Sequence, residues 1–476
     1  MKKLDRFYID GKWTEPVGKG LFELINPATE EAYGHVTLGS AEDVERAVEA
    51  ARRAFASFSQ SKKEWRMELL SSIVDSLLHR QSDLMDAVTE EMGAPSNLKG
   101  QTGTAVQAFR QAIVTLREYS FEHMLGDNVV RREPIGVCGL ISAWNWPLQL
   151  LCQKLASAFA AGCTVVAKPS EFTPLSAVVL AEALDAAGVP PGVFNLMNGD
   201  GPTVGEAISR HPGIDMVSFT GSTRAGVMVA QAAAGTVKRV CQELGGKSAN
   251  IILPDADLAA AARFNVSRGF SNTGQSCHSP TRMLVSEGQA DELIELIRKE
   301  AQSVKVGDPK NPETTIGPVV NRAQFERVQH FIELGIQEGA NVVTGGPGRP
   351  EGIKKGFFIR PTVFSGVTRD MTVAQEEIFG PVLSVITYRD IDDAIEIANG
   401  TRYGLGGYLF SSNVENARRV AERMQAGRIF LNGAPSNNVA PMGGYKQSGN
   451  GREMGVFGLE EYLEVKAMLG FVSAAA

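Results

Sequence analysis

The stretch Gly136-Val-Cys-Gly-Leu-Ile-Ser-Ala-Trp-Asn-Trp-Pro147 decides the fold. Residues 137–141 are short and apolar, as in a buried β-strand, and a loop that ends in a proline follows them. The apolar residues 148–161 then predict a helix. A second such run, Thr164-Val-Val-Ala167, comes next. Short strands separated by helices predict parallel pairing with right-handed crossovers. We therefore predict a doubly wound sheet, which binds ligands at the carboxyl ends of its strands.

The same alternation continues on the C-terminal side. Further strands are predicted at residues 193–196, 215–219 and 239–242, with helices at 174–187 and 223–234. A second alternating region runs from about residue 249 to 443, with strands at 251–253, 282–285, 341–343 and 382–386. The chain therefore has an α/β fold with a second α/β domain.

The N-terminal hundred residues mix strand and helix. Residues 6–14 alternate apolar and polar side chains around an Asp10-Gly11 turn, which predicts a β-hairpin. Ser40 and Asp43 form a capping box before a helical apolar stripe. Two segments fit neither domain: the charged, extended piece at 122–133 and the C-terminal piece at 459–466.

Composition excludes several classes of function. A chain of 476 residues is too long for one core and predicts two or three domains. Its net charge of −7 gives no basic surface for nucleic acid or an anionic membrane. The N-terminus lacks the apolar run of a secretory signal, and no segment has the uninterrupted apolar length of a membrane span. We expect a cytoplasmic enzyme.

Cysteine and histidine usage gives no indication of a structural metal or disulfide. The five cysteines are odd in number and lack paired metal spacing, and the six histidines are scattered. We therefore expect no metal and no disulfide framework.

Cys277 lies in the segment Asn272-Thr-Gly-Gln-Ser-Cys-His-Ser-Pro280. Its small polar neighbours let a substrate and backbone N–H donors reach the thiol, as an acyl-forming nucleophile requires. Upstream, Glu243-Leu-Gly-Gly-Lys-Ser248 supplies a carboxylate that could serve as a separate base. A buried, inert cysteine is the alternative. His278 is the immediate neighbour of Cys277, so we expect its ring to point elsewhere.

Three motifs follow predicted strands of the first sheet. Asn145, between two tryptophans and before Pro147, can aim an amide N–H at an oxyanion, although the tryptophans could also be plain packing. Ser222, in Phe219-Thr-Gly-Ser-Thr-Arg-Ala-Gly226, opens a helix whose free N–H groups can hold a pyrophosphate, or it is only a capped turn. Lys168 and Glu171 suit ribose hydroxyls, or form an exposed charged loop. A carboxylate there would repel a 2′-phosphate, which favours NAD over NADP.

Taken together, the order and spacing of these motifs resemble the aldehyde dehydrogenase superfamily along nearly the whole chain. The matching motifs are Trp144-Asn-Trp-Pro147, Lys168-Pro-Ser-Glu171, Phe219-Thr-Gly-Ser222, Glu243-Leu-Gly-Gly246, Gly274-Gln-Ser-Cys277, Glu377-Ile-Phe-Gly-Pro381 and Gly443-Gly-Tyr-Lys-Gln-Ser-Gly449.

The resemblance implies oxidation of an aldehyde to a carboxylic acid through a thiohemiacetal and a thioester, with NAD as hydride acceptor. It implies that Cys277 is the nucleophile, Glu243 the base that activates water, and Asn145 the oxyanion donor. It also implies cofactor contacts from Ile141, Trp144, Lys168, Glu171, Gly201, Phe219, Ser222, Leu244, Gln324, Glu377 and Phe379. The substrate tunnel is expected near Trp146, Gln149, Leu150, Gln153, Ser276, His278, Ser436 and Asn437.

The family pattern also implies an organisation of the whole chain. We expect residues 1–118 and 135–244 to form the dinucleotide-binding domain and residues 245–445 the catalytic domain. Residues 119–134 and 446–476 would form a small β oligomerisation arm and C-terminal strand, which gives a homodimer or homotetramer. This chain departs from the pattern at Ala143, Met442 and His278, where many members carry other residues. The departures affect the shape of the substrate pocket and remove no catalytic group.

Two other functions remain open at this point. A coenzyme A-acylating dehydrogenase would pass the thioester to coenzyme A, but such relatives typically lack the carboxylate at the position of Glu243. A non-catalytic nucleotide-binding or structural relative would be expected to lose Cys277, Glu243 or the nucleotide motif. The amides and hydroxyls of the predicted tunnel favour polar or aromatic aldehydes over long-chain aliphatic ones. The resemblance also disfavours a short acidic semialdehyde, because the succinate-semialdehyde branch of the family carries an Arg near the position of Gln153.

Overall fold

The strands predicted between residues 137 and 242 lie in one sheet of the computed structural model, which describes residues 1–471. They are β8 (Val137–Ile141), β9 (Thr164–Lys168), β10 (Phe194–Leu196), β11 (Met216–Thr220) and β12 (Arg239–Glu243). All five run parallel, in the order β12-β11-β8-β9-β10. The chain builds outward from β8 first through β9 and β10, and then on the other side through β11 and β12. The order therefore reverses between β8 and β11, where open α/β sheets bind their ligands.

Antiparallel strands complete both edges of this sheet. The predicted hairpin is confirmed as β2 (Phe7–Ile9) and β3 (Lys12–Thr14), and it extends the sheet beyond β10. At the opposite edge, β20 (Gly449–Asn450) pairs with β12. The C-terminal part of the chain therefore returns to complete the first sheet.

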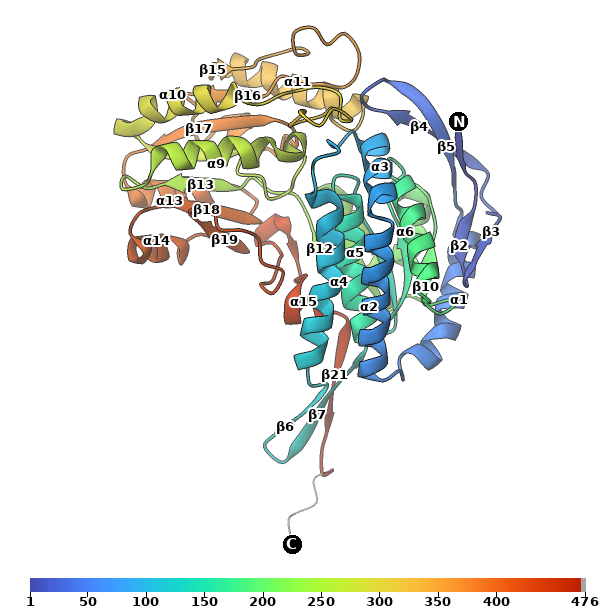
Figure 1. The fold of residues 1–476 in the computed structure, drawn as a ribbon. Helices are drawn as coiled ribbons and strands as arrows, with labels where there is room; N and C mark the ends of the chain where they lie inside the picture. The colour runs from blue at the N-terminus through green and yellow to red at the C-terminus, as the bar shows by residue number, and fades with distance from the viewer. Residues whose placement is uncertain (472–476) are drawn as a thin grey trace.

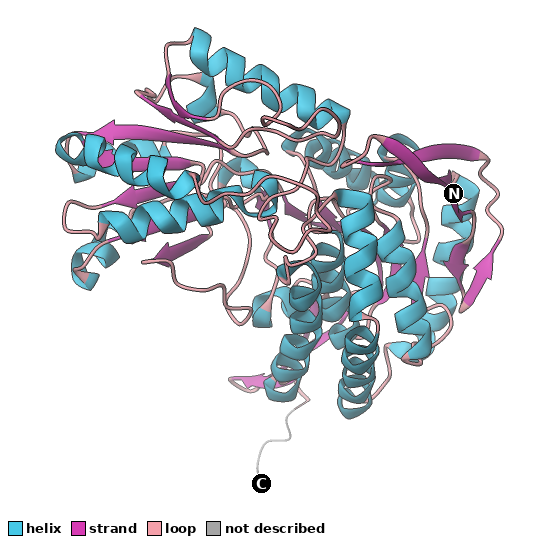
Figure 2. Ribbon diagram, turned by 45° about the horizontal axis from the view of Figure 1, so that its top comes forward, coloured by secondary structure: helices cyan, strands magenta, loops and turns pink. Residues whose placement is uncertain are grey.

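Helices cover both faces of the first sheet, as a doubly wound fold requires (Figures 1 and 2). One face carries α1 (Ala41–Phe58), α7 (Glu206–Arg210) and α8 (Thr223–Ala233). The other carries α2 (Lys63–His79), α3 (Gln81–Met92), α4 (Gly100–Glu118), α5 (Pro147–Ala161) and α6 (Leu175–Ala186). Every residue of β8 is buried, because side chains on both faces of the strand pack under helices. The predicted capping box is present: Ser40 and Asp43 bond reciprocally at the start of α1.

The second alternating region forms a separate sheet with its own helices. Its strands, in the order β15-β16-β17-β14-β13-β18-β19, are β15 (Asn341–Thr344), β16 (Thr362–Ser365), β17 (Val382–Tyr388), β14 (Arg282–Ser286), β13 (Ala249–Ile252), β18 (Gly406–Phe410) and β19 (Arg428–Leu431). Helices α9 (Leu258–Phe270) and α10 (Ala290–Ala301) pack on one face. The other face carries α11 (Arg322–Gln337), α12 (Thr372–Gln375), α13 (Ile391–Asn399) and α14 (Val414–Ala421).

Two small sheets complete the described part of the chain. Strands β1 (Lys2–Leu4), β5 (Glu31–Leu38) and β4 (Gly20–Asn26) form one near the N-terminus. In the other, β7 (Asn128–Pro134) pairs with β6 (Glu122–Leu125) and β21 (Leu463–Met468), and Figure 1 shows these strands projecting from the rest of the molecule. The C-terminal segment first forms the short helix α15 (Gly455–Glu460) before β21 begins. No helix within residues 1–471 is both long and apolar enough to cross a bilayer.

Candidate active site

The loops that carry Asn145 and Cys277 are joined by buried hydrogen bonds. Asn145 lies between β8 and α5, and its Nδ2 donates to the backbone oxygen of Gln275 at 3.0 Å. The backbone oxygen of Asn145 accepts in return from Asn272 Nδ2 at 2.8 Å. Asn272 has a left-handed backbone, with φ of 55°, in the tight turn that precedes Cys277. Since an amide nitrogen carries two hydrogens, Asn145 keeps one for a further acceptor.

Cys277 is the one half-buried cysteine, and the other four are buried. Burial raises the pKa of its thiol, and the charges of Glu243 and Glu377 raise it further. These influences also place both carboxylates near the sulfur. The thiol therefore needs hydrogen-bond donors or positive charge to react as a thiolate.

His278 lies against the sulfur, so the expectation that its ring points elsewhere is wrong. Its Nδ1 is 3.8 Å from Cys277 Sγ, and its Nε2 contacts the guanidinium of Arg268 on α9. Burial, with the positive charges of Arg268 and Arg428, holds the pKa of His278 well below its usual range. These influences favour the neutral form of the ring.

Glu243 ends β12, and its carboxyl is buried. Neither oxygen has a hydrogen-bond partner among the described residues. Burial raises the pKa of Glu243 to about 8, and the charge of Glu453 adds to the effect. Glu453 itself forms a buried ion pair with Lys154 on α5. A carboxyl that loses its proton near neutral pH has the pKa a general base requires.

The segment containing Glu377 and Phe379 faces the loop after β8. Glu377 Oε1 accepts from the backbone N–H of Gly246 at 3.0 Å, and burial raises the pKa of Glu377 to about 7. The Phe379 ring meets Trp144 edge-on, with centroids 5.3 Å apart. Gln324 Nε2 donates to the backbone oxygen of Phe379 at 2.7 Å. Four of the predicted cofactor residues are thus brought close to Cys277 and the first sheet.

The remaining predicted cofactor residues lie at the carboxyl ends of the parallel strands or just after them. Ile141 ends β8, and Phe219 lies near the end of β11. Lys168 is buried at the end of β9, with its Nζ 3.5 Å from Glu171 Oε2. Ser222 caps α8 by accepting from Ala225 N at 3.3 Å.

Two further predicted residues flank this edge. Leu244 follows β12, and its N–H donates to Ser448 at 3.0 Å. Gly201 is exposed and starts a single π-helical turn that Asp200 caps. Ile141 and Phe219 lie on β8 and β11, the two strands between which the order reverses, and the other residues follow or end neighbouring strands of the same sheet, so the edge fits a dinucleotide.

A cavity of about 280 Å³ lies beside Cys277. The predicted tunnel residues that line it are Trp146, Gln149, His278 and Ser436. Ser276 lies at its border, since its Oγ accepts from Trp146 Nε1 at 2.9 Å. The prediction missed Arg268, Arg428, Thr104, Phe430, Asn438 and Met454, which also line it. Arg268 lies on a helix without a motif, so no pattern in the sequence could have identified it.

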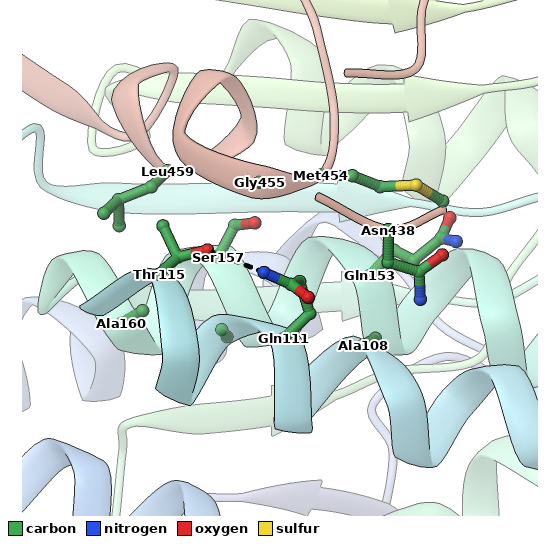
Figure 3. A pocket seen from close by; sticks show the side chains of 11 residues that line it. Ala108, Gln111, Thr115, Gln153, Ser157, Ala160, Asn438, Met454, Gly455 and Leu459 are labelled. Atoms are coloured by element: carbon green, nitrogen blue, oxygen red, sulfur yellow. Dashed lines mark hydrogen bonds between the residues drawn. The ribbon is translucent and has the colours of Figure 1, made fainter. Parts of the chain in front are cut away.

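Gln153 does not line this cavity. It lies on α5 beside a neighbouring, smaller cavity, where Figure 3 shows its side chain between Asn438 and α4. Neither end of its buried amide has a hydrogen-bond partner in the described part of the chain. Asn438 and Met454 line both cavities, so the two adjoin.

The chain is similar to known proteins along nearly its whole length. The model of the aldehyde dehydrogenase family matches residues 13–468. The chain is 51% identical to the 3-succinoylsemialdehyde-pyridine dehydrogenase of a Pseudomonas species, over 99% of both chains.

Solved structures of aldehyde dehydrogenases are similar throughout. Aldehyde Dehydrogenase C of Pseudomonas syringae, a cysteine-to-alanine mutant complexed with NAD+ and octanal, matches with a TM-score of 0.98 and 52% identity, covering 99% of this chain and 98% of that one. The Mycobacterium tuberculosis aldehyde dehydrogenase complexed with NAD+ matches with a TM-score of 0.96 and 39% identity over 100% of both chains. The protein belongs to the aldehyde dehydrogenase family and is an oxidoreductase of that type.

Proposed function

We propose that the protein oxidises an aldehyde to a carboxylic acid with NAD+ as hydride acceptor, through a covalent intermediate on Cys277. The observation that carries this proposal is the convergence of three groups: a half-buried thiol, the Asn145 amide joined to its loop, and a buried carboxyl with no partner among residues 1–471. That set matches a nucleophile, an oxyanion donor and a base.

Each of the three groups acts in one step of the proposed reaction. The Cys277 thiolate attacks the aldehyde carbonyl, and the oxyanion of the thiohemiacetal accepts from Asn145 Nδ2 and the backbone N–H of Cys277. Bound NAD+ supplies the hydride acceptor that oxidises this adduct to a thioester. Glu243 then takes a proton from the water that attacks the thioester, which releases the acid and restores the thiol.

The strand-end residues support NAD as the cofactor. Lys168 ends β9 and Glu171 follows it, at the position where an adenosine ribose lies in such sheets. A carboxylate at that position accepts ribose hydroxyls and repels a 2′-phosphate. The NAD+ complexes of two similar structures agree with this choice.

The test is an assay of NADH absorbance with the wild-type enzyme and with Cys277→Ser. We expect aldehyde-dependent NADH formation by the wild type and none by the variant, with NADH binding retained by both. NADH binding without turnover of any aldehyde by the wild type would favour the non-catalytic alternative. Acyl-coenzyme A formed on addition of coenzyme A would favour the acylating one.

The cavity lining supports a preference for polar or aromatic aldehydes. Besides Trp146 and Phe430, it presents the guanidinium groups of Arg268 and Arg428 and the amide of Gln149. One relative is named for a substrate that contains a pyridine ring, whereas another was complexed with octanal. A panel of aldehydes decides between them: a kcat/KM for decanal above that of every polar or aromatic aldehyde would overturn this preference.

The projecting strands support assembly into a homo-oligomer. Met124 and Leu125 on β6, Val465 on β21 and Leu469 after it are exposed apolar side chains. Isolated apolar strands of this kind are stable when another chain covers them. Sedimentation velocity should therefore give the mass of a dimer or tetramer, and Val465→Glu should shift it toward the monomer. The three-part division of the chain stays a prediction.

A further inference from the structure

His278 contacts a charged or reactive partner through each of its ring nitrogens. Nδ1 is 3.8 Å from Cys277 Sγ, a distance at which a ring N–H can donate to sulfur. Nε2 contacts Nη2 of Arg268. Both side chains line the cavity beside the thiol. The three residues thus form a chain from helix α9 to the sulfur.

The chemistry of the guanidinium fixes the tautomer of His278. Arg has five N–H donors and no acceptor, and it stays protonated in proteins. Nε2 must therefore accept, so in the neutral ring the proton resides on Nδ1. Nδ1–H then faces the sulfur and can only donate to it.

The surrounding groups keep the ring in this state. Arg428 on β19 adds positive charge, which together with burial and Arg268 holds the pKa of His278 low. On β18, the hydroxyl of Tyr408 donates to the His278 backbone oxygen at 2.7 Å and so holds the residue in place. Besides burial, the charges of Glu243 and Glu377 raise the pKa of the thiol. A donor at Nδ1 opposes the effect of these two carboxylates.

We propose that His278 is a catalytic residue whose Nδ1–H donates a hydrogen bond to the Cys277 thiolate, and that Arg268 is the positioning residue that fixes this tautomer. The proposal rests on Cys277 being the nucleophile. This role falls on His278, one of the positions where the chain departs from the family pattern. A neutral imidazole stabilises the thiolate without forming a permanent ion pair, so the sulfur remains free to attack.

The first experiment titrates the thiol directly. The rate constant for alkylation of Cys277 by iodoacetamide is measured from pH 5 to 10 in the enzyme without substrate, and mass spectrometry identifies the alkylated residue. In His278→Ala we expect the thiol pKa to rise by about one unit, which slows alkylation roughly tenfold below that pKa. His278→Asn places an amide near the position of Nδ1, so it should reverse at least half of the rise in thiol pKa that His278→Ala causes.

A double-mutant cycle tests the role of Arg268. Arg268→Met frees Nε2, so the imidazole can take up a proton, and we expect a second inflection at the acid end of the alkylation profile, below the ordinary histidine pKa of about 6.5 because burial and Arg428 remain. This inflection should vanish in Arg268→Met/His278→Ala, because Arg268 acts through His278. Arg268→Lys keeps a donor and should behave as the wild type. Arg263→Gln is the matched control: it removes an exposed arginine of the same helix and should leave the profile unchanged.

The outcomes separate this proposal from the proposed function. Alkylation that does not occur at Cys277, or activity in Cys277→Ser, would contradict the nucleophile itself. Alkylation at Cys277 with the same pH profile in the wild type, His278→Ala and His278→Asn would overturn only the role of His278. If Arg268→Met changed the alkylation profile equally in the wild type and in His278→Ala, the positioning role of Arg268 would be wrong. Binding of NADH, measured by fluorescence, confirms that each variant is folded.

Discussion

The ring of Phe379 meets the ring of Trp144 edge-on at 5.3 Å, and so connects the loop before β17 with the loop after β8. Phe379 has a left-handed backbone, with φ of 62°, which a large side chain rarely adopts. Strain of this kind persists where the surroundings require one geometry, and it is common at ligand sites. The pair therefore joins the two loops at residues that we expect to contact the cofactor.

Truncating this contact should slow hydride transfer. In Phe379→Ala the aromatic contact, worth about 1 kcal/mol, is lost, and the bound cofactor should be held less firmly. We expect the NADH burst to slow on the order of tenfold, with a smaller change in KM for the aldehyde. Stopped-flow absorbance measures the burst, and an unchanged rate would mean that Phe379 does not position the cofactor.

Removing the proposed base should separate the two halves of the reaction. In Glu243→Gln, thioester formation continues but water is no longer activated, so acid release should slow by about 10² to 10⁴. A burst of about one NADH per active site, followed by near-zero turnover, is the expected trace. Release of acid at the wild-type rate, without accumulation of acyl enzyme, would refute this role.

The rate of acid release should depend on pH in a defined direction. The pKa of Glu243 is raised to about 8, mainly by burial. Only the carboxylate form accepts a proton from water, so single-turnover acid release should increase as the pH rises from 6 and level off above about 8. In Glu243→Gln this increase should disappear. A rate that falls over the same interval would contradict the assignment.

Loss of the Asn145 amide should affect the chemistry more than binding. Asn145→Ala removes one oxyanion donor, which typically costs about 10² to 10³ in rate. The expected change appears in the NADH burst, with the dissociation constant of NADH unchanged. Asn145→Asp has nearly the same size but adds a negative charge, and it should be at least as slow. Equal burst rates in the wild type and Asn145→Ala would exclude the oxyanion role.

Removing the carboxylate after β9 should relax the cofactor preference. Glu171→Gln retains an acceptor for ribose hydroxyls and removes the charge that repels a 2′-phosphate. We expect the ratio of kcat/KM for NADP+ to that for NAD+ to increase at least about tenfold. Glu182→Gln, which removes a surface carboxylate on α6, is the control for net charge and should leave the ratio unchanged.

The sequence predicted the elements whose cause is local. Val137-Cys-Gly-Leu-Ile141 has the continuous apolar character of a parallel strand buried on both faces, and the reciprocal Ser40 and Asp43 contacts need only three residues of helix. The motif around Cys277 indicated a nucleophile, because small polar neighbours leave a thiol accessible. The family resemblance came from the order and spacing of all the motifs along the chain.

What the sequence did not predict depends on side-chain direction and on distant contacts. The Arg268 to His278 contact depends on which face of α9 points at the site and on one ring rotamer. Gln153 was expected in the tunnel, but it lies one helical turn beyond Gln149 on the same face of α5, and this displacement along the helix places it in the smaller cavity instead. The effect of Glu453 on Glu243 joins residues 210 positions apart, which no local pattern contains.

The antiparallel strand β20 has a consequence for biosynthesis. It pairs with β12 only after the whole second sheet has been made, and Glu453, the carboxylate partner of Lys154, is translated soon after it. Until these residues have been synthesised, the β12 edge of the first sheet is therefore open and Lys154 lacks its counterion. Chains that stop before residue 449 would keep that border exposed and would be substrates for chaperones or proteases, however complete their catalytic motifs are.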